Sequence, residues 1–168
     1  MSARSNFGRA FVYGDDITTD ALAPGAYMKK PVEEMASHCL EAIDPNFAKA
    51  VRAGDVVVGG ENFGMGSSRE QAAIALRQLG VNAVVAKSFA GLFFRNAVNV
   101  GLAPLVCAEA DRIRPGDELS VEPVVGRIEN LTTGEIYTCE PIPPHLLDMI
   151  RDGGLLPHLE KKLRKTAR

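Results

Sequence analysis

Three short apolar runs divide the middle of the chain, and none of them alternates with polar residues. The runs occupy residues 55–58, 83–86 and 102–107. Each of the first two precedes a segment that we predict as a helix ended by a glycine, at about 67–79 and 89–98, with Ser88 as the N-cap of the second. Unalternating strands separated by helices are typical of parallel strands covered on both faces. Residues 55–107 are therefore predicted to form a β-α-β-α-β unit with right-handed crossovers.

The segment before this unit contains one predicted strand and one predicted helix. Residues 8–13 are expected to form the strand, and a polar loop follows at 14–20. A second loop runs to residue 30, and Pro31 suits the first position of a helix. The residues expected on the buried face of this helix are Met35, Cys39 and Ala42.

Beyond residue 107 the pattern changes to short strands with turn residues between them. The predicted strands are 118–124, 127–131 and 135–140. They indicate a small antiparallel patch, and a helix from 144 to about 163 follows, interrupted at Gly153-Gly154. Residues 1–168 are therefore predicted to form one α/β domain, in which the parallel unit carries a small antiparallel extension and a C-terminal helix.

Composition narrows the class of protein without identifying it. The 168 residues are 46% hydrophobic and 24% charged with a net charge of −2, which gives no strong field for nucleic acid or acidic lipid. The basic residues near the C-terminus are interpreted as a solvated helix end. No apolar run approaches the roughly 18 residues of a membrane span, and no secretory signal is visible. We therefore expect a cytoplasmic protein with neither a nucleic-acid nor a membrane partner.

The cysteines bear on both redox compartment and metal binding. Cys39, Cys107 and Cys139 are widely spaced and odd in number, which suits a reducing cytosol better than a disulfide framework. No Cys-x-x-Cys spacing occurs among them. The chain is therefore not expected to hold an iron–sulfur cluster by itself, and no residue is assigned as a metal ligand.

A glycine-rich turn after the first apolar run carries the clearest chemistry. Gly64 and Gly66 allow the backbone to turn tightly and to approach a ligand closely. Ser67 and Glu70 match a capping box at the start of the next helix. Free N–H groups and the positive end of the helix dipole favour an anion there, and Arg69 can hold a carboxylate through two parallel hydrogen bonds. The turn is therefore predicted to bind a small carboxylate or phosphate.

Most nucleotide-binding roles are excluded by the same residues. A dinucleotide fingerprint needs a third glycine where Arg69 stands, and an acidic residue where Ala86 and Lys87 lie. The Gly-Lys-Ser/Thr of a phosphate-binding loop is missing from the sequence. Spacing alone leaves open that the turn is only a well-capped helix start with Arg69 in solvent. A serine such as Ser67 needs donors and positive charge to act as a base, and no Ser-His-Asp arrangement is evident.

Five segments together closely resemble the family of aconitase-type swivelling domains. They are residues 13–20, 60–70, 83–90, 94–102 and 152–157. The resemblance implies the β/β/α swivelling fold, and the length resembles stand-alone small subunits of hydro-lyases. Examples are the 3-isopropylmalate dehydratases, homoaconitases, citramalate/citraconate hydratases and dimethylmalate dehydratases. It also implies a large-subunit partner, which carries a [4Fe-4S] cluster with one iron open to substrate and over which the small subunit closes.

The resemblance assigns roles to individual residues. Ser67 matches the serine that, as an alkoxide, removes the proton next to a carboxylate. Ser68 and Arg69 match contacts to the substrate carboxylate. Asp20 matches an aspartate that supports the acid–base network, although spacing alone would make it an ordinary loop aspartate.

The second loop corresponds to the segment that selects the substrate in this family. Here it contains Tyr27, Met28, Lys29 and Lys30. Isopropylmalate enzymes tend to present apolar residues there for a branched alkyl group, whereas homoaconitases tend to present arginine for a third carboxylate. Lys29 and Lys30 match neither pattern. Gln71 also departs from the family's usual histidine, and glutamine can form hydrogen bonds but cannot titrate. The site is modified if that histidine is catalytic and little changed if it is structural, and we favour the structural interpretation.

The leading hypothesis is a small subunit of an iron–sulfur hydro-lyase that interconverts 2-isopropylmalate and 3-isopropylmalate by dehydration and rehydration, as in leucine biosynthesis. Such a chain would be active only with its cluster-bearing large subunit. An alternative is a related hydro-lyase, so the expected small-molecule partner is a di- or tricarboxylic acid. A stand-alone binding or regulatory domain is the alternative from another class. The joint presence of Asp20, Ser67, Ser68 and Arg69 argues against it.

Overall fold

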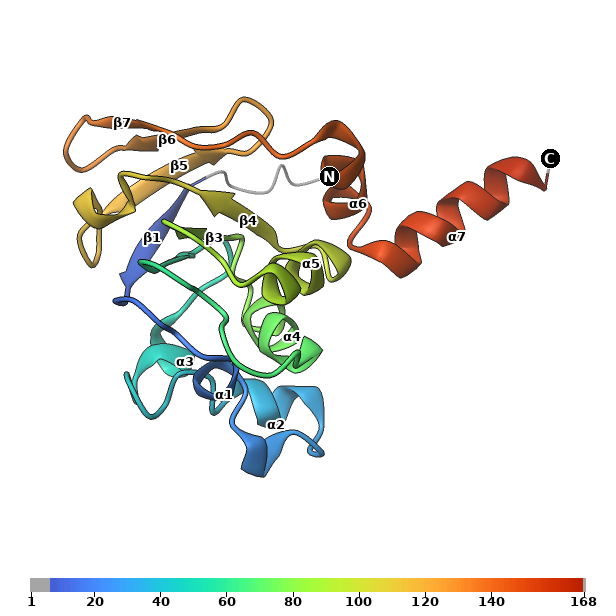
Figure 1. The fold of residues 1–168 in the computed structure, drawn as a ribbon, viewed down its shortest axis with the longest axis horizontal. Helices are drawn as coiled ribbons and strands as arrows, with labels where there is room; N and C mark the ends of the chain where they lie inside the picture. Colours follow the sequence, from blue (N-terminus) through green and yellow to red (C-terminus); the bar gives the residue numbers. More distant parts are fainter. Residues whose placement is uncertain (1–6, 168) are drawn as a thin grey trace.

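A computed structural model describes residues 7–167 of the chain (Figure 1). The described residues form one seven-stranded sheet in the order β4-β3-β2-β1-β5-β6-β7. The strands are β1 (Phe7–Val12), β2 (Val56–Val58), β3 (Ala83–Ala86), β4 (Ala103–Val106), β5 (Glu118–Glu122), β6 (Arg127–Asn130) and β7 (Ile136–Thr138). Strand β1 pairs in parallel with β2 and antiparallel with β5, so it joins a parallel half of the sheet to an antiparallel half.

Helices cover the parallel half of the sheet on one side (Figure 1). The helical segments are α1 (Thr19–Leu22), η1 (Gly25–Tyr27), α2 (Val32–Ala36), α3 (Phe47–Ala50), α4 (Glu70–Gln78), α5 (Gly91–Asn99), η2 (Ala110–Arg112), α6 (Pro144–Arg151) and α7 (Leu155–Thr166). Helix α4 packs against α1, α2 and α5, and α6 packs against α5 and α7.

Both faces of the parallel strands are buried, in two separate cores. On the helix side, Val57 and Val84 lie in one apolar cluster with Leu76 of α4. On the other side, Val85 lies in a second cluster with Tyr137 of the antiparallel half. This burial on both faces explains why the strands contain no polar alternation.

The predicted α/β class, the β-α-β-α-β unit over 55–107 and the antiparallel extension are confirmed. Helices α6 and α7 are separate because Gly153 and Gly154 both have positive φ angles, of 93° and 125°. The helix predicted from Pro31 is shorter than expected, since α2 ends at Ala36 and turns follow it. Its predicted residue Ala42 is exposed, which is a correction to the expected buried face.

Two predicted helix starts are wrong. Helix α4 begins at Glu70, three residues after Ser67, and no side chain caps it, so the predicted capping box does not form. Helix α5 begins at Gly91, and Ser88 is not its cap. Instead the Ser88 hydroxyl accepts a hydrogen bond from the Asn62 N–H at 2.8 Å. Neither serine caps a helix: Ser67 Oγ lies 3.4 Å from Thr19 Oγ1 of α1, and Ser88 Oγ bonds to the loop at 61–62.

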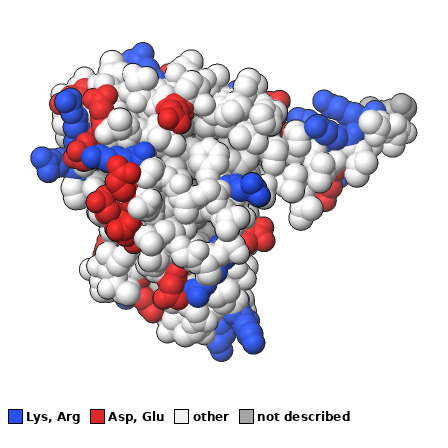
Figure 2. Space-filling view, viewed as in Figure 1, with Lys and Arg blue, Asp and Glu red and all other residues white. Residues whose placement is uncertain are grey.

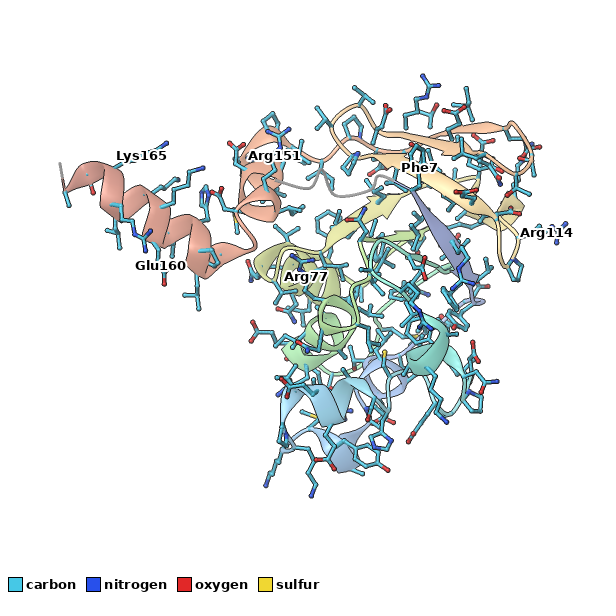
Figure 3. All side chains as sticks on the ribbon, turned by 180° about the vertical axis from the view of Figure 1, so that it is seen from behind. Phe7, Arg77, Arg114, Arg151, Glu160 and Lys165 are labelled. Carbon is cyan, nitrogen blue, oxygen red and sulfur yellow. The ribbon has the colours of Figure 1, made fainter. Side chains whose placement is uncertain are left out.

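Helix α7 projects from the body of the molecule (Figure 1). Its apolar residues Leu156 and Leu163 are 72% and 68% exposed. Glu160 and Lys165 lie along α7 and away from the sheet (Figure 3). Basic side chains gather on this helix, whereas the rest of the face in Figure 2 carries charges of both signs. Among residues 7–167, no helix combines the length and the apolar composition needed to cross a membrane.

Candidate active site

The loops that follow β1, β2 and β3 meet at the carboxyl ends of the parallel strands. The loop at 59–69, after β2, lies between the other two. On one side, the Gly60 N–H donates to Gly14 O at 3.1 Å, and on the other the Lys87 N–H donates to Gly60 O at 3.0 Å. Ligands of open α/β sheets bind preferentially at this edge. The three loops therefore place the predicted site where the fold class favours one.

Two glycines of the turn are required by the space around them. Gly64 has a φ of +83°, and a Cβ there would lie 2.2 Å from the ring of the buried Phe93. Gly66 has a φ of +110°, and a Cβ there would lie 3.2 Å from Thr19 Oγ1. Both positions combine a left-handed backbone with a close neighbour, which only glycine accommodates without strain. The turn is thus pressed against α5 on one side and α1 on the other.

The exposed end of the turn presents backbone donors next to a serine. Ser67 and Ser68 are exposed. Within residues 7–167, the N–H groups of Gly66, Ser67 and Ser68 donate to no protein acceptor. The N-terminus of α4 still lies at the turn, although it begins later than predicted. Successive free N–H groups and a helix N-terminus favour an anion at this place.

Arg69 is fixed by α1 rather than left in solvent. Its Nη1 donates to Asp20 Oδ1 at 2.6 Å and to Ala23 O at 3.0 Å, and the Arg69 side chain is 22% exposed. The hydrogen bond from Arg69, and a second one from the Gly25 N–H, lower the pKa of Asp20 below its ordinary value. Asp20 is therefore a carboxylate at neutral pH that orients the guanidinium, and it carries no proton to give.

The loop that follows α1 begins beside this ion pair. A Cβ at Gly25 would lie 3.6 Å from Asp20 Oδ1. Two residues on, the ring of Tyr27 stacks on His38 with centroids 3.6 Å apart and an interplanar angle of 1°. His38 Nδ1 lies 2.6 Å from a carboxylate oxygen of Glu41. The Tyr27 side chain is thus held by the segment after α2.

The other residues of this loop have fewer contacts with the rest of the protein than Tyr27 has. Met28 is half-buried, whereas Lys29 and Lys30 are exposed, and neither lysine forms an ion pair with another described residue. Gln71 is half-buried in the first turn of α4. The structure therefore places the start of the loop beside Arg69 and leaves the two lysines in solvent.

Two residues around the site, Thr19 and His38, have no role in the sequence predictions. Thr19 is buried, and its Oγ1 lies 3.4 Å from Ser67 Oγ. His38 supports Tyr27, as described above. Thr19 lies inside a segment that was recognised, directly before Asp20, so its position could have been noticed. No pattern in the sequence connects His38 with Tyr27.

The side chains of this chain do not fit an iron–sulfur cluster. A [4Fe-4S] cluster with one iron open to substrate still needs three thiolates around it, so all three cysteines of the chain would have to lie together. Cys39 lies in the core on the helix side, whereas Cys107 and Cys139 lie in the other core. Among residues 7–167, no group of three or more His, Cys, Asp or Glu side chains could hold a metal ion.

The comparisons with known proteins agree on one family. Residues 20–110 match the family described as the aconitase C-terminal domain. The 3-isopropylmalate dehydratase small subunit 1 of Archaeoglobus fulgidus is 50% identical over 162 residues, covering 95% of this chain and 99% of that protein. The methanogen homoaconitase small subunit of Methanothermobacter thermautotrophicus is 45% identical, covering 93% and 91%. A crystal structure of 3-isopropylmalate dehydratase from Methanocaldococcus jannaschii superposes with a TM-score of 0.91 at 43% identity, covering 96% of each chain.

Proposed function

This chain belongs to the aconitase C-terminal domain family, among the small subunits of 3-isopropylmalate dehydratase-type hydro-lyases, and from that premise we propose that it supplies the catalytic base and the groups that bind the substrate carboxylate. The reaction we propose is the interconversion of 2-isopropylmalate and 3-isopropylmalate by dehydration and rehydration. The partner is a large subunit, which we propose carries the [4Fe-4S] cluster, since the cysteines of this chain do not fit one. We place the complex in the cytoplasm, where three reduced thiols persist.

The observation that carries the proposal is the group formed by Ser67, Arg69 and Asp20. Asp20 fixes Arg69 at 2.6 Å, so the guanidinium is oriented before any ligand arrives. Ser67 is exposed two residues away, beside backbone N–H groups without a protein acceptor. A fixed cation next to free N–H donors suits a carboxylate. A substrate held in this way would present the carbon next to that carboxylate to Ser67.

The chemistry of this chain is a proton transfer with charge stabilisation. The Ser67 alkoxide takes the proton from the carbon, and the electron pair of the broken C–H bond moves toward the adjacent carboxylate. Arg69 and the N–H groups of Ser67 and Ser68 stabilise the negative charge that accumulates there. In the reverse direction the Ser67 hydroxyl returns the proton. Asp20 supports this acid–base network as a carboxylate that keeps the guanidinium in place.

Substrate choice is proposed to depend on the loop from Tyr27 to Lys30. The half-buried Met28 suits a branched alkyl group, which supports isopropylmalate as the substrate. A second candidate is a tricarboxylic acid, as in homoaconitases, and the observation that favours it is the pair of exposed lysines, Lys29 and Lys30. Either lysine can pair with a third carboxylate.

An activity screen of the reconstituted complex tests the proposal. The chain is mixed with its large subunit and assayed on isopropylmalate, citraconate, dimethylmalate and homoaconitate. We expect turnover of isopropylmalate, and Ser67→Ala should reduce kcat by about 10²–10⁴-fold. Ser120→Ala, on β5 in the antiparallel half, is the matched control and should leave kcat unchanged. A complex that turns over none of these acids would refute the proposal and would favour a binding domain.

A second experiment separates the two substrate classes. Lys29→Met and Lys30→Met together should raise kcat/KM for isopropylmalate relative to homoaconitate if the lysines bind a third carboxylate. An unchanged ratio means that neither lysine contacts the substrate. In that case Met28 and its neighbours alone would account for selectivity.

A further inference from the structure

We infer that Thr19 is a positioning residue for Ser67, with its hydroxyl donating a hydrogen bond to Ser67 Oγ in the reactive state. The inference rests on the proposed function, because it concerns how Ser67 becomes a base. A serine hydroxyl is a weak base, and its alkoxide needs hydrogen-bond donors. No histidine contacts Ser67 among the described residues, so the donors must come from elsewhere.

Thr19 is built into the fold in a way that aims its hydroxyl at the turn. It is the first residue of α1 and is 3% exposed. Its N–H donates to Met65 O at 2.9 Å, which ties α1 to the glycine-rich turn. Its Oγ1 then lies 3.4 Å from Ser67 Oγ and beside the open Cβ position of Gly66. A side chain at Gly66 would occupy the space over the Thr19 hydroxyl.

The direction of the hydrogen bond follows from the charge on Ser67. Between two neutral hydroxyls either oxygen can be the donor. Once Ser67 loses its proton it can only accept, so Thr19 must donate. A separation of 3.4 Å is long for two hydroxyls, and hydrogen bonds to an ionised oxygen are shorter and stronger. The contact is thus weak in the resting state and strengthens when the alkoxide forms.

The charged groups next to this pair are Asp20 on α1 and Arg69 in the turn. They bond to each other at 2.6 Å, so their charges largely offset. Glu70 begins α4 one residue beyond Arg69 and is exposed. A substitution at Thr19 leaves these charged side chains in the protein. The difference between the variant and the wild type is then the Thr19 hydroxyl.

Thr18 provides a matched control in the same segment. Its hydroxyl accepts a hydrogen bond from the Ala21 N–H at 3.0 Å and so caps α1. Thr18→Val therefore removes a hydroxyl that supports the helix but has no contact with Ser67. Thr19→Val keeps the branched shape of the side chain and removes only the hydrogen-bonding group next to Ser67.

The test compares these variants in the reconstituted complex. We expect Thr19→Val to lower kcat by about 10- to 100-fold with little change in KM, and Thr19→Ser to restore most of the rate. The acidic limb of the kcat/KM profile should move to higher pH in Thr19→Val, because Ser67 holds its proton more tightly without a donor. Thr18→Val should leave that limb in place. In a Ser67→Ala background, Thr19→Val should cause no further loss.

The possible outcomes separate this inference from the proposed function. Wild-type turnover that Ser67→Ala abolishes, together with full activity in Thr19→Val, would overturn the inference alone. A Thr19→Val loss of equal size in the Ser67→Ala background would also overturn it, since the threonine would not act through the serine. A wild-type complex inactive on every substrate overturns both. If Thr19→Val fails to fold, Thr19→Ser and Thr19→Ala replace it, because they differ only in the hydroxyl.

Discussion

Replacing Gly64 by alanine should destabilise the protein far more than the same change at Gly134. Both glycines have nearly the same backbone, with φ angles of +83° and +80°. An alanine at either costs about 1–2 kcal/mol in the left-handed region, partly offset by about 0.4–1 kcal/mol from the stiffer unfolded chain. A Cβ at Gly134 meets nothing within 4 Å, whereas at Gly64 it lies 2.2 Å from the ring of Phe93. Phe93 is 2% exposed and packed in the core, so relief of this clash costs a further ~1–3 kcal/mol.

Urea unfolding of the two variants measures the difference directly. Gly134→Ala should lower the free energy of unfolding by roughly 0.5–1 kcal/mol and Gly64→Ala by about 2–4 kcal/mol. The unfolded-state contribution is common to both variants and cancels in the comparison. Equal losses, within about 0.5 kcal/mol, would refute the claim that the turn is pressed against α5.

Three further predictions concern other parts of the chain. The hydrogen bond from Arg69 lowers the pKa of Asp20, so its carboxyl should titrate below the ordinary range of an aspartate in carbon-13 NMR. The ion pair is then intact at neutral pH and is lost as pH falls through the lowered pKa; an ordinary pKa in the wild type, or no rise of the pKa in Arg69→Met, would contradict the pairing. The buried Asn130 donates to Asp117 at 2.8 Å, so Asn130→Ala should cost about 1–3 kcal/mol in urea unfolding, and a loss under about 0.5 kcal/mol would count against this contact. A hydrogen bond from the Cys139 thiol lowers the pKa of Cys107 to about 7, yet the Cys107 side chain is buried. Its reaction with an aromatic disulfide reagent should therefore be limited by opening of the structure, and rapid labelling of the native protein would show otherwise.

The parallel half of the fold could be predicted from sequence because its strands are buried on both faces. Val57 and Val84 face the helices, and Val85 faces the antiparallel strands, so apolar residues run without interruption. The glycine-rich turn could also be predicted, because positions with a close neighbour and a left-handed backbone require glycine, which the sequence shows directly. Gly64 and Gly66 both meet neighbours within 3.2 Å of a Cβ position.

The helix starts and the inner contacts of the site could not be predicted in the same way. Ser67 has the spacing of a capping residue, but its hydroxyl faces Thr19, which is 48 positions away in the sequence. Arg69 and Asp20 are separated by 49 positions. Contacts between residues so far apart in the sequence depend on how the loops after β1 and β2 meet. The spacing of neighbouring residues does not predict how these loops meet. The roles proposed for these residues come from the family resemblance, and their arrangement comes from the structure.

The most direct test of the account is the kcat of the reconstituted complex with Ser67→Ala, measured beside the binding of the two subunits. A base at Ser67 predicts a fall in kcat of about 10²–10⁴-fold, with the affinity between subunits unchanged. A kcat that stays close to the wild-type value in a fully assembled complex would contradict the assignment of Ser67 as the base.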